Sequence, residues 1–192
     1  MTDIARFEKL VEHRKCREGI IEGSKTYAYV MDGEDGISSE LGFASNMISQ
    51  SDYFLISNNN LLFIELTDVA DAIKECILNE QFLKLESATF AELLRKKPEK
   101  AISIINGKIW SEVLSEFKNK WMGSIAILER YCRKINYTDN FEYGMLIILK
   151  NNTDPMQLDS LKMRLKGMIS DLELCTTDKT ESVLLAREKK LV

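Results

Sequence analysis

Histidine is almost absent from this sequence, paired cysteines are missing, and no long apolar run occurs. The 192 residues contain one histidine, His13, and four cysteines, none of them in a C-x-x-C pair. This composition argues against a zinc site and favours reduced thiols in a cytoplasmic protein. Because neither a membrane-spanning run nor the apolar segment of a signal peptide is present, we expect a cytoplasmic protein without a membrane partner.

A strong positive charge is also missing. The formal net charge is −4, which argues against a protein that coats nucleic acid by bulk charge but leaves a local basic face open. Apolar residues make up 45% and charged residues 29% of the chain, as in ordinary globular proteins. At this length we expect one domain that spans residues 1–192.

The most informative stretch runs from Ser51 to Ala72. Two short apolar and aromatic runs flank the three asparagines 58–60, which readily enter the turns that a hairpin needs. Asp52 opens the first run, and Glu65 interrupts the second near its end. A carboxylate in such a run is costly unless it is paired or coordinated. A hairpin that brings Asp52 and Glu65 to one edge would offer two hard oxygen ligands to a divalent metal.

This pattern resembles the core of the PD-(D/E)XK nuclease-like superfamily. Its mark is an Asp near the start of one strand, a Glu-x-Lys late in the next and then a helix, and the likeness covers roughly Lys25 to Gln81, with an extension to Lys150. The resemblance implies that Asp52 and Glu65 bind magnesium, with manganese as a substitute. In active members of the family a lysine helps to position and activate the attacking water.

The sequence departs from the family at that lysine. The tripeptide here is Glu65-Leu66-Thr67, so Thr67 occupies the lysine position. Lys74, on the helix expected to follow, is a candidate substitute, although an exposed lysine on a helix flank is the simpler interpretation. Glu40 is a candidate third metal ligand, and the alternative is an acid that suits the first turn of a helix.

The hydrophobic pattern predicts the remaining elements. We expect an α/β (α+β) fold with a central mixed sheet of four or five strands, flanked by helices, in the restriction-endonuclease-like order αβββαβ. Trp110 and Trp121 lie on the apolar stripe of the longest helical pattern and should be buried. The expected helices cover 2–17, 68–81, 82–97 and 108–135, with a short helix that carries Leu41 to Ile48 and a last helix with apolar positions from Met156 to Leu172. The other expected elements are strands over 26–31 and 141–150, an extended piece over 102–105 and an edge strand over 182–186.

Three functional hypotheses follow. In the first, the protein is a nuclease-like fold with a degenerate site, weak or inactive, which binds nucleic acid or protein, because threonine supplies no positive charge. In the second, it is an active magnesium-dependent DNA endonuclease with a relocated lysine. In the third, it is an unrelated α/β protein-interaction module, in which Glu65 points to solvent or pairs with a lysine and does not face Asp52. A nucleic-acid partner, a protein partner and a homodimer all remain open.

Overall fold

The structure is a computed structural model that describes residues 4–14, 21–44, 47–95, 97–138 and 140–190. Within these ranges it is a mixed α/β fold with one six-stranded sheet, in which the strands lie side by side in chain order. The first four strands pair antiparallel with one another, and the fourth, fifth and sixth strands pair parallel. The strands are β1 (Glu8–Arg14), β2 (Ile21–Val30), β3 (Tyr53–Ser57), β4 (Asn60–Thr67), β5 (Glu142–Leu149) and β6 (Leu172–Thr176).

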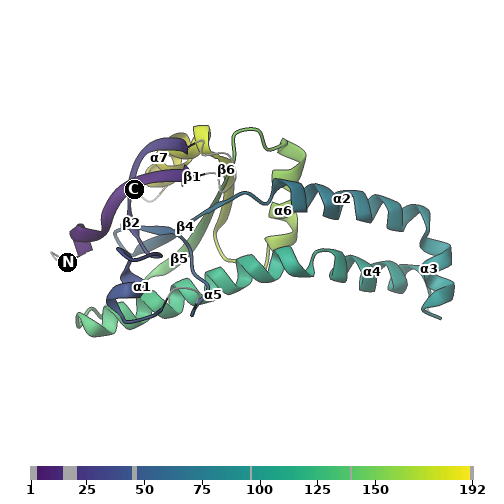
Figure 1. The fold of residues 1–192 in the computed structure, drawn as a ribbon, viewed down its shortest axis with the longest axis horizontal. Coiled ribbons are helices and arrows are strands. Elements are labelled where there is room, and N and C mark those ends of the chain that lie inside the picture. Colours follow the sequence, from purple (N-terminus) through teal and green to yellow (C-terminus); the bar gives the residue numbers. More distant parts are fainter. Residues whose placement is uncertain (1–3, 15–20, 45–46, 96, 139, 191–192) are drawn as a thin grey trace.

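Helices lie on both faces of this sheet, and three more form an arm beyond it. The long helix α5 runs beneath the sheet, α7 lies on the opposite side, and α2, α3 and α4 form an arm that projects from one end of the molecule (Figure 1). The helices are α1 (Ile37–Glu40), α2 (Ala70–Leu85), α3 (Ser87–Leu93), α4 (Pro98–Ile109), α5 (Ser111–Lys134), α6 (Pro155–Leu165) and α7 (Thr180–Lys190), with short 3-10 helices at Ile4–Phe7 and Thr177–Lys179. None of the helices in the described ranges is long and apolar enough to cross a membrane.

The hairpin of β3 and β4 forms as its sequence predicts. Asn58 adopts a φ of 53°, a left-handed conformation that asparagine tolerates better than most residues. The pairing runs from Ser57 opposite Asn60 to Tyr53 opposite Ile64. This register fixes which side chains of the two strands share a face of the sheet.

Alternate residues of β4 belong to two different cores. Leu61 and Phe63 pack in the larger core, to which α5 and α6 contribute. Leu62 and Ile64 pack in the smaller core, together with Leu184 of α7. Because side chains alternate along a strand, Glu65 lies on the same face as Phe63, toward α5.

The long helix is anchored by its aromatic stripe, which confirms the burial expected for its tryptophans. Trp110, which precedes α5 directly, and Phe117 are fully buried, and Trp121 is 8% exposed. The Trp121 ring meets the Phe63 ring edge-on at 5.6 Å between centroids. This contact fixes one side of α5 against the strand that carries Glu65.

Several expected elements are wrong. Residues 4–14 form a 3-10 helix and β1 instead of a helix, so the described part of the chain does not begin with the first helix of the αβββαβ order. The sheet has six strands, not four or five. Residues 102–105 lie inside α4, and residues 182–186 lie inside α7. The last strand, β6, was not foreseen. In each case pairing or packing with distant residues overrides the local pattern.

We expect Trp121→Ala to lower the free energy of unfolding by about 3–5 kcal/mol, because it leaves a cavity between α5 and β4. Met122 is the matched control, since it is the next residue of the same helix and is 58% exposed. Chemical denaturation should show almost no loss for Met122→Ala. A loss below about 1 kcal/mol for Trp121→Ala would contradict its role as an anchor.

Candidate functional site

Asp52 and Glu65 are brought together by the register of the hairpin. Tyr53, the first residue of β3, pairs with Ile64, so Asp52, which directly precedes β3, stands opposite Glu65. The Asp52 Oδ2 atom accepts a hydrogen bond from the backbone N–H of Leu66 at 2.8 Å. Two of the candidate site residues therefore lie at the same edge of the hairpin.

Glu65 is a fully buried acid whose partner comes from another element. Its side chain is 0% exposed, and its Oε1 atom forms an ion pair with the ammonium of Lys120 on α5. The Lys120 side chain is 22% exposed and also lies 3.6 Å from Glu116, one turn earlier on the helix. The other carboxylate oxygen of Glu65, Oε2, has no hydrogen-bond partner among the described residues. The site thus holds two acids and a lysine, with one buried oxygen left over.

Burial and mutual repulsion disfavour the charged forms of Asp52 and Glu65. Burial raises the pKa of Glu65 well above its ordinary value, and the neighbouring Asp52 raises it further, while Lys120 opposes both effects. Burial also raises the pKa of Asp52, against the Leu66 hydrogen bond and Lys120. Burial alone would lower the pKa of Lys120, but the charges of Glu65 and Asp52 outweigh it and the net shift is upward. The lysine therefore keeps its charge, and the acid pair would gain from further positive charge.

A close contact on α5 holds the start of β3 in place. The backbone N–H of Ser51 donates a hydrogen bond to Ser124 Oγ at 2.8 Å. At Gly123, an added Cβ would overlap the carbonyl oxygen of Ser49 and lie 2.9 Å from Ile48 Cγ2. Only glycine therefore lets the segment before Asp52 approach α5 this closely.

The other candidate residues lie elsewhere. Thr67 is buried at the end of β4 and, by alternation, lies on the face of Glu65. Lys74 is exposed on α2 and borders a cavity between α2 and α6, with a volume of about 620 Å³. Glu40 forms ion pairs with Arg6 at 3.2 Å and Lys134 at 2.8 Å. Neither Lys74 nor Glu40 makes a hydrogen bond or ion pair with Asp52 or Glu65 in the described part of the chain.

Lys120 is the residue that the sequence did not reveal. It lies 55 positions beyond Glu65 in the chain, on a helix face where lysines and glutamates alternate. Such a face is usually solvated, and the chain has 26 basic residues to choose from. The usable signal was indirect: an acid inside the apolar β4 pattern calls for a cationic partner.

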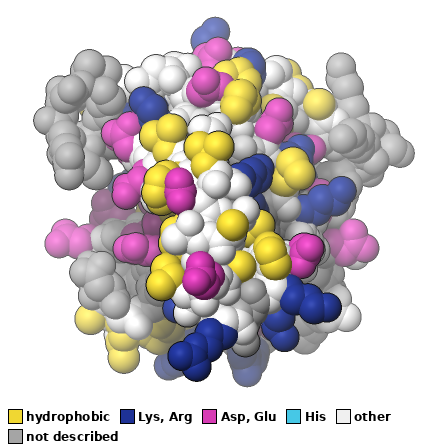
Figure 2. Space-filling model, turned by 90° about the vertical axis from the view of Figure 1, so that its right-hand side faces the viewer, with side chains coloured by type: hydrophobic (Ala, Val, Ile, Leu, Met, Phe, Trp, Pro, Cys, Tyr) yellow, Lys and Arg dark blue, Asp and Glu magenta, His cyan; other side chains and the backbone are white. Residues whose placement is uncertain are grey.

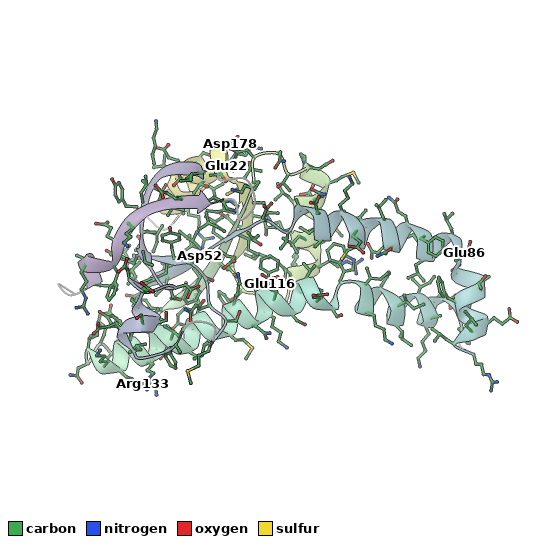
Figure 3. All side chains as sticks on the ribbon, in the orientation of Figure 1. Glu22, Asp52, Glu86, Glu116, Arg133 and Asp178 are labelled. Atoms are coloured by element: carbon green, nitrogen blue, oxygen red, sulfur yellow. The ribbon has the colours of Figure 1, made fainter. Side chains whose placement is uncertain are left out.

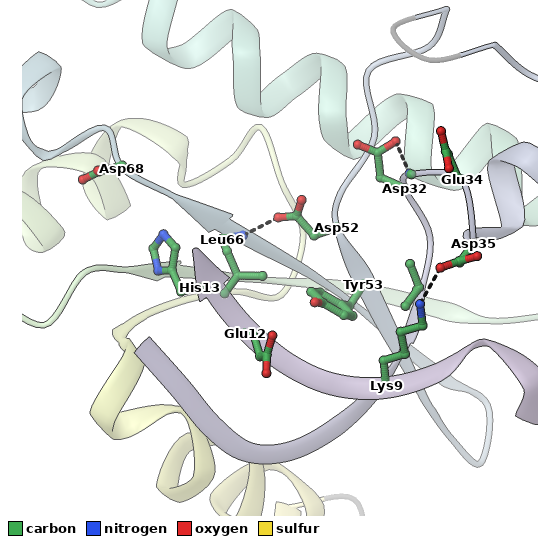
Figure 4. A pocket seen from close by; sticks show the side chains of 12 residues that line it. Lys9, Glu12, His13, Asp32, Glu34, Asp35, Asp52, Tyr53, Leu66 and Asp68 are labelled. Carbon is green, nitrogen blue, oxygen red and sulfur yellow. Dashed lines mark hydrogen bonds and ion pairs between the residues drawn. The ribbon is translucent and has the colours of Figure 1, made fainter. Parts of the chain in front are cut away.

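An acidic cavity of about 480 Å³ opens beside Asp52 (Figure 4). It lies between β1, the ends of β3 and β4 and the loop that follows β2. Because its lining holds six carboxylates and one lysine, the cavity attracts cations and repels anions. Its charged and titratable lining residues are Lys9, Glu12, His13, Asp32, Glu34, Asp35, Asp52 and Asp68.

Comparison of the chain with protein-family models, curated proteins and solved structures gave no match.

His13, in the wall of this cavity, should make the stability depend on pH. The residue is 3% exposed, its Nδ1 lies 3.4 Å from Thr177 Oγ1, and burial followed by the charge of Lys150 lowers its pKa to about 4, against the opposing charges of Glu22 and Asp68. The unfolded chain binds a proton near pH 6.5, so this contribution to stability is present above pH 6.5 and is lost as the pH falls toward 4. We expect the loss to reach about 1–2 kcal/mol at pH 5.

Urea unfolding of wild type and His13→Gln at pH 7 and pH 5 isolates this contribution. The raised pKa values of Asp52 and Glu65 act with the opposite sign, because their contribution falls as the pH rises through those values. Since these acids are common to both proteins, the difference between wild type and variant reports on His13. An equal pH dependence in the two proteins would contradict the assignment.

Gly123→Ala should lower the free energy of unfolding by about 1–3 kcal/mol, since the new methyl group displaces the segment before Asp52. Gly107 provides the matched control, because it also lies in a helix and an added Cβ there meets nothing within 4 Å. We expect Gly107→Ala to be neutral or stabilising by up to about 1 kcal/mol. Equal effects of the two substitutions in chemical denaturation would show that the contact at Gly123 does not matter.

Proposed function

We propose that this protein is a metal-dependent nuclease with a PD-(D/E)XK-like site, in which Lys120 of α5 supplies the amine that Thr67 lacks. The single observation that carries the proposal is the ion pair between Lys120 and the buried Glu65. It sets a lysine beside an acid that stands opposite Asp52. The three groups that the motif needs are thus present, one of them from a different element.

The donor set suits a hard divalent cation such as magnesium or manganese. Asp52 and Glu65 provide carboxylate oxygens, and the unpartnered Glu65 Oε2 is a buried acceptor that such a cation would satisfy. No group of three or more metal-ligating His, Cys, Asp or Glu side chains occurs in the described ranges. Two carboxylates are enough for magnesium, which keeps several waters and binds substrate phosphate oxygens. When bound, the cation would polarise a phosphodiester and lower the pKa of a water molecule.

The protein's own groups have separate roles in this proposal. Lys120 stays protonated next to Glu65 and provides the fixed positive charge that stabilises charge developing on the phosphate. Burial in β4 holds Glu65 in one orientation, and the Leu66 N–H holds Asp52. Each acid is therefore preorganised by the hairpin, so little reorganisation is needed for reaction.

The surrounding charge makes the cation essential. Glu116 lies on α5 beside Lys120, and six of the twelve residues that line the cavity next to Asp52 are acids (Figures 3 and 4). Such a surface repels a phosphodiester unless positive charge is added. We therefore expect both cleavage and nucleic-acid binding to depend strongly on the divalent cation.

The order of elements gives partial support. Three antiparallel strands, β2 to β4, lead through helices to β5, which pairs parallel with β4. This arrangement matches the βββαβ part of the expected core. A strand, β1, stands where the expected core begins with a helix.

A structural ion pair in an unrelated α/β scaffold is the second candidate. The pairing of Glu65 with a lysine is what that hypothesis expects. It gives no reason for a second acid, Asp52, opposite Glu65, because that acid raises the cost of keeping Glu65 charged. The position of Asp52 therefore favours the metal site.

A cleavage assay on duplex and single-stranded DNA with magnesium or manganese tests the proposal. We expect wild type to cut and both Glu65→Gln and Lys120→Met to lose about 100-fold or more, because each lacks a charge in the transition state. Lys74→Ala, which removes an exposed lysine, should cut as wild type does. Adding Thr67→Lys to Lys120→Met should restore part of the activity, since Thr67 lies on the face of Glu65.

Two controls separate chemistry from folding. Removing one partner of a buried pair destabilises, so each variant is first checked by chemical denaturation. Manganese should also raise the Tm of wild type and not that of Glu65→Gln, which reports on metal binding without turnover. Wild-type cleavage no greater than that of Glu65→Gln would contradict an active site and leave the degenerate, binding-only hypothesis.

A further inference from the structure

The helical arm exposes apolar side chains on the side that faces away from its own packing. On α2, Ile73, Cys76 and Leu83 are buried toward the rest of the chain. The opposite stripe is also apolar: Leu78 is 54% exposed, Phe82 58% and Leu85 82%. Large apolar side chains that gather on an exposed face mark an interaction site more often than scattered ones do. This side of α2 is therefore a candidate contact surface.

The exposed stripe has the spacing of a coiled coil. Asp71, Glu75, Leu78, Phe82 and Leu85 follow one another at steps of four, three, four and three residues. Steps of this kind keep one narrow face turned toward a partner helix. The three apolar members lie together in the half of α2 that projects from the body, where the far end of the arm is marked by Glu86 (Figure 3). We call these five residues the arm stripe.

The apolar surface continues from the arm stripe onto α3. The rings of Phe82 and Phe90 meet edge-on at 6.4 Å between centroids, and Leu93 is 72% exposed. Viewed toward this end of the molecule, hydrophobic side chains lie among charged ones over the facing surface (Figure 2). We estimate that the exposed leucine and phenylalanine side chains present on the order of 500 Å² of apolar area, near the upper end for a monomer.

We propose that the arm stripe is a dimer interface that packs antiparallel against the same stripe of a second copy of this chain. Two such patches, each made of the arm stripe and the exposed side chains of α3, bury on the order of 1,000 Å² in total, which is the lower bound for a specific interface. A two-fold axis near Glu80 doubles the contact without any other surface, and two-fold dimers are the commonest oligomers. The area thus fits a second copy of the arm.

The antiparallel direction follows from the charges in the stripe. A parallel pair would place Glu75 against Glu75 and Lys74 beside Lys74, and like charges would repel. In the antiparallel pair, Leu78 meets Phe82 of the second copy, and Leu85 meets the aliphatic stem of Glu75. Gln81 is exposed and lies within one residue of the axis, so its side chain approaches the same residue of the second copy, where two amides can exchange hydrogen bonds.

Sedimentation equilibrium over a range of protein concentrations tests the interface. We expect the mass to rise toward twice the 22.0 kDa of one chain. Phe82→Ser should weaken association at least about tenfold, because an exposed aromatic at the centre of the stripe is a hot spot. The matched control is Tyr27→Ser on β2, which removes a 59% exposed aromatic far from the arm and should leave association unchanged. A monomer at every concentration, or a dimer that Phe82→Ser leaves intact, overturns the proposal.

A disulfide cross-link tests the direction of packing. Oxidised Gln81→Cys should form a covalent dimer, since the two thiols would approach each other beside the axis. Lys108→Cys, on the exposed end of α4, should give no more cross-linking than wild type, whose native cysteines are present in all the proteins compared. Association without cross-linking at position 81 overturns the antiparallel arrangement. Neither experiment depends on metal or nuclease activity, so its failure is distinguishable from failure of the proposed function.

Discussion

The buried ion pair between Glu65 and Lys120 is the constraint on which the rest of the site depends. A charged carboxylate inside β4 would be expensive on its own, and a second acid opposite it adds to the cost. The pair is supported from both sides: Trp121 packs on Phe63 of the same strand, and Gly123 lets the segment before Asp52 approach α5. The geometry of the site therefore depends on how α5 packs against the sheet, because any shift of α5 moves Lys120 away from the two acids.

Local sequence was sufficient for the parts of the fold whose signals are local. The asparagine turn between two apolar runs predicted the β3–β4 hairpin, and the long three- and four-residue period predicted α5 with its buried tryptophans. It failed where the outcome depends on distant partners. Residues 4–14 carry a helix-like period, yet most of them pair with β2 as β1, and residues 182–186 form a helix that covers the smaller core.

The residues of the candidate site also differ in whether a local sequence signal marks them. Asp52 and Glu65 were recognisable because an acid at the end of an apolar run is unusual, and hairpin register then sets them opposite each other. Lys120 was not recognisable, because a lysine on a mixed helix face carries no local mark of burial. Lys74 was the nearer candidate in sequence, but α2 leads away from the sheet into the arm and leaves that lysine exposed. The cationic partner of a buried acid is thus better sought among the helices that cover its strand than among its neighbours in the chain.

The segment between β4 and β5 contains both the arm stripe and the helix that carries Lys120. It begins directly after the site strand, extends outward as the arm and returns as α5, which carries Lys120. Near its base, a cavity of about 280 Å³ separates α2 from α5 and is lined by Glu75 of the arm stripe and by Glu116, the neighbour of Lys120. Three acids face this space, Glu75, Glu112 and Glu116, so their mutual repulsion acts on both helices. Glu75 therefore belongs both to the arm stripe and to the wall of this cavity. Its charge acts on the proposed interface and, through Glu116, on the surroundings of Lys120.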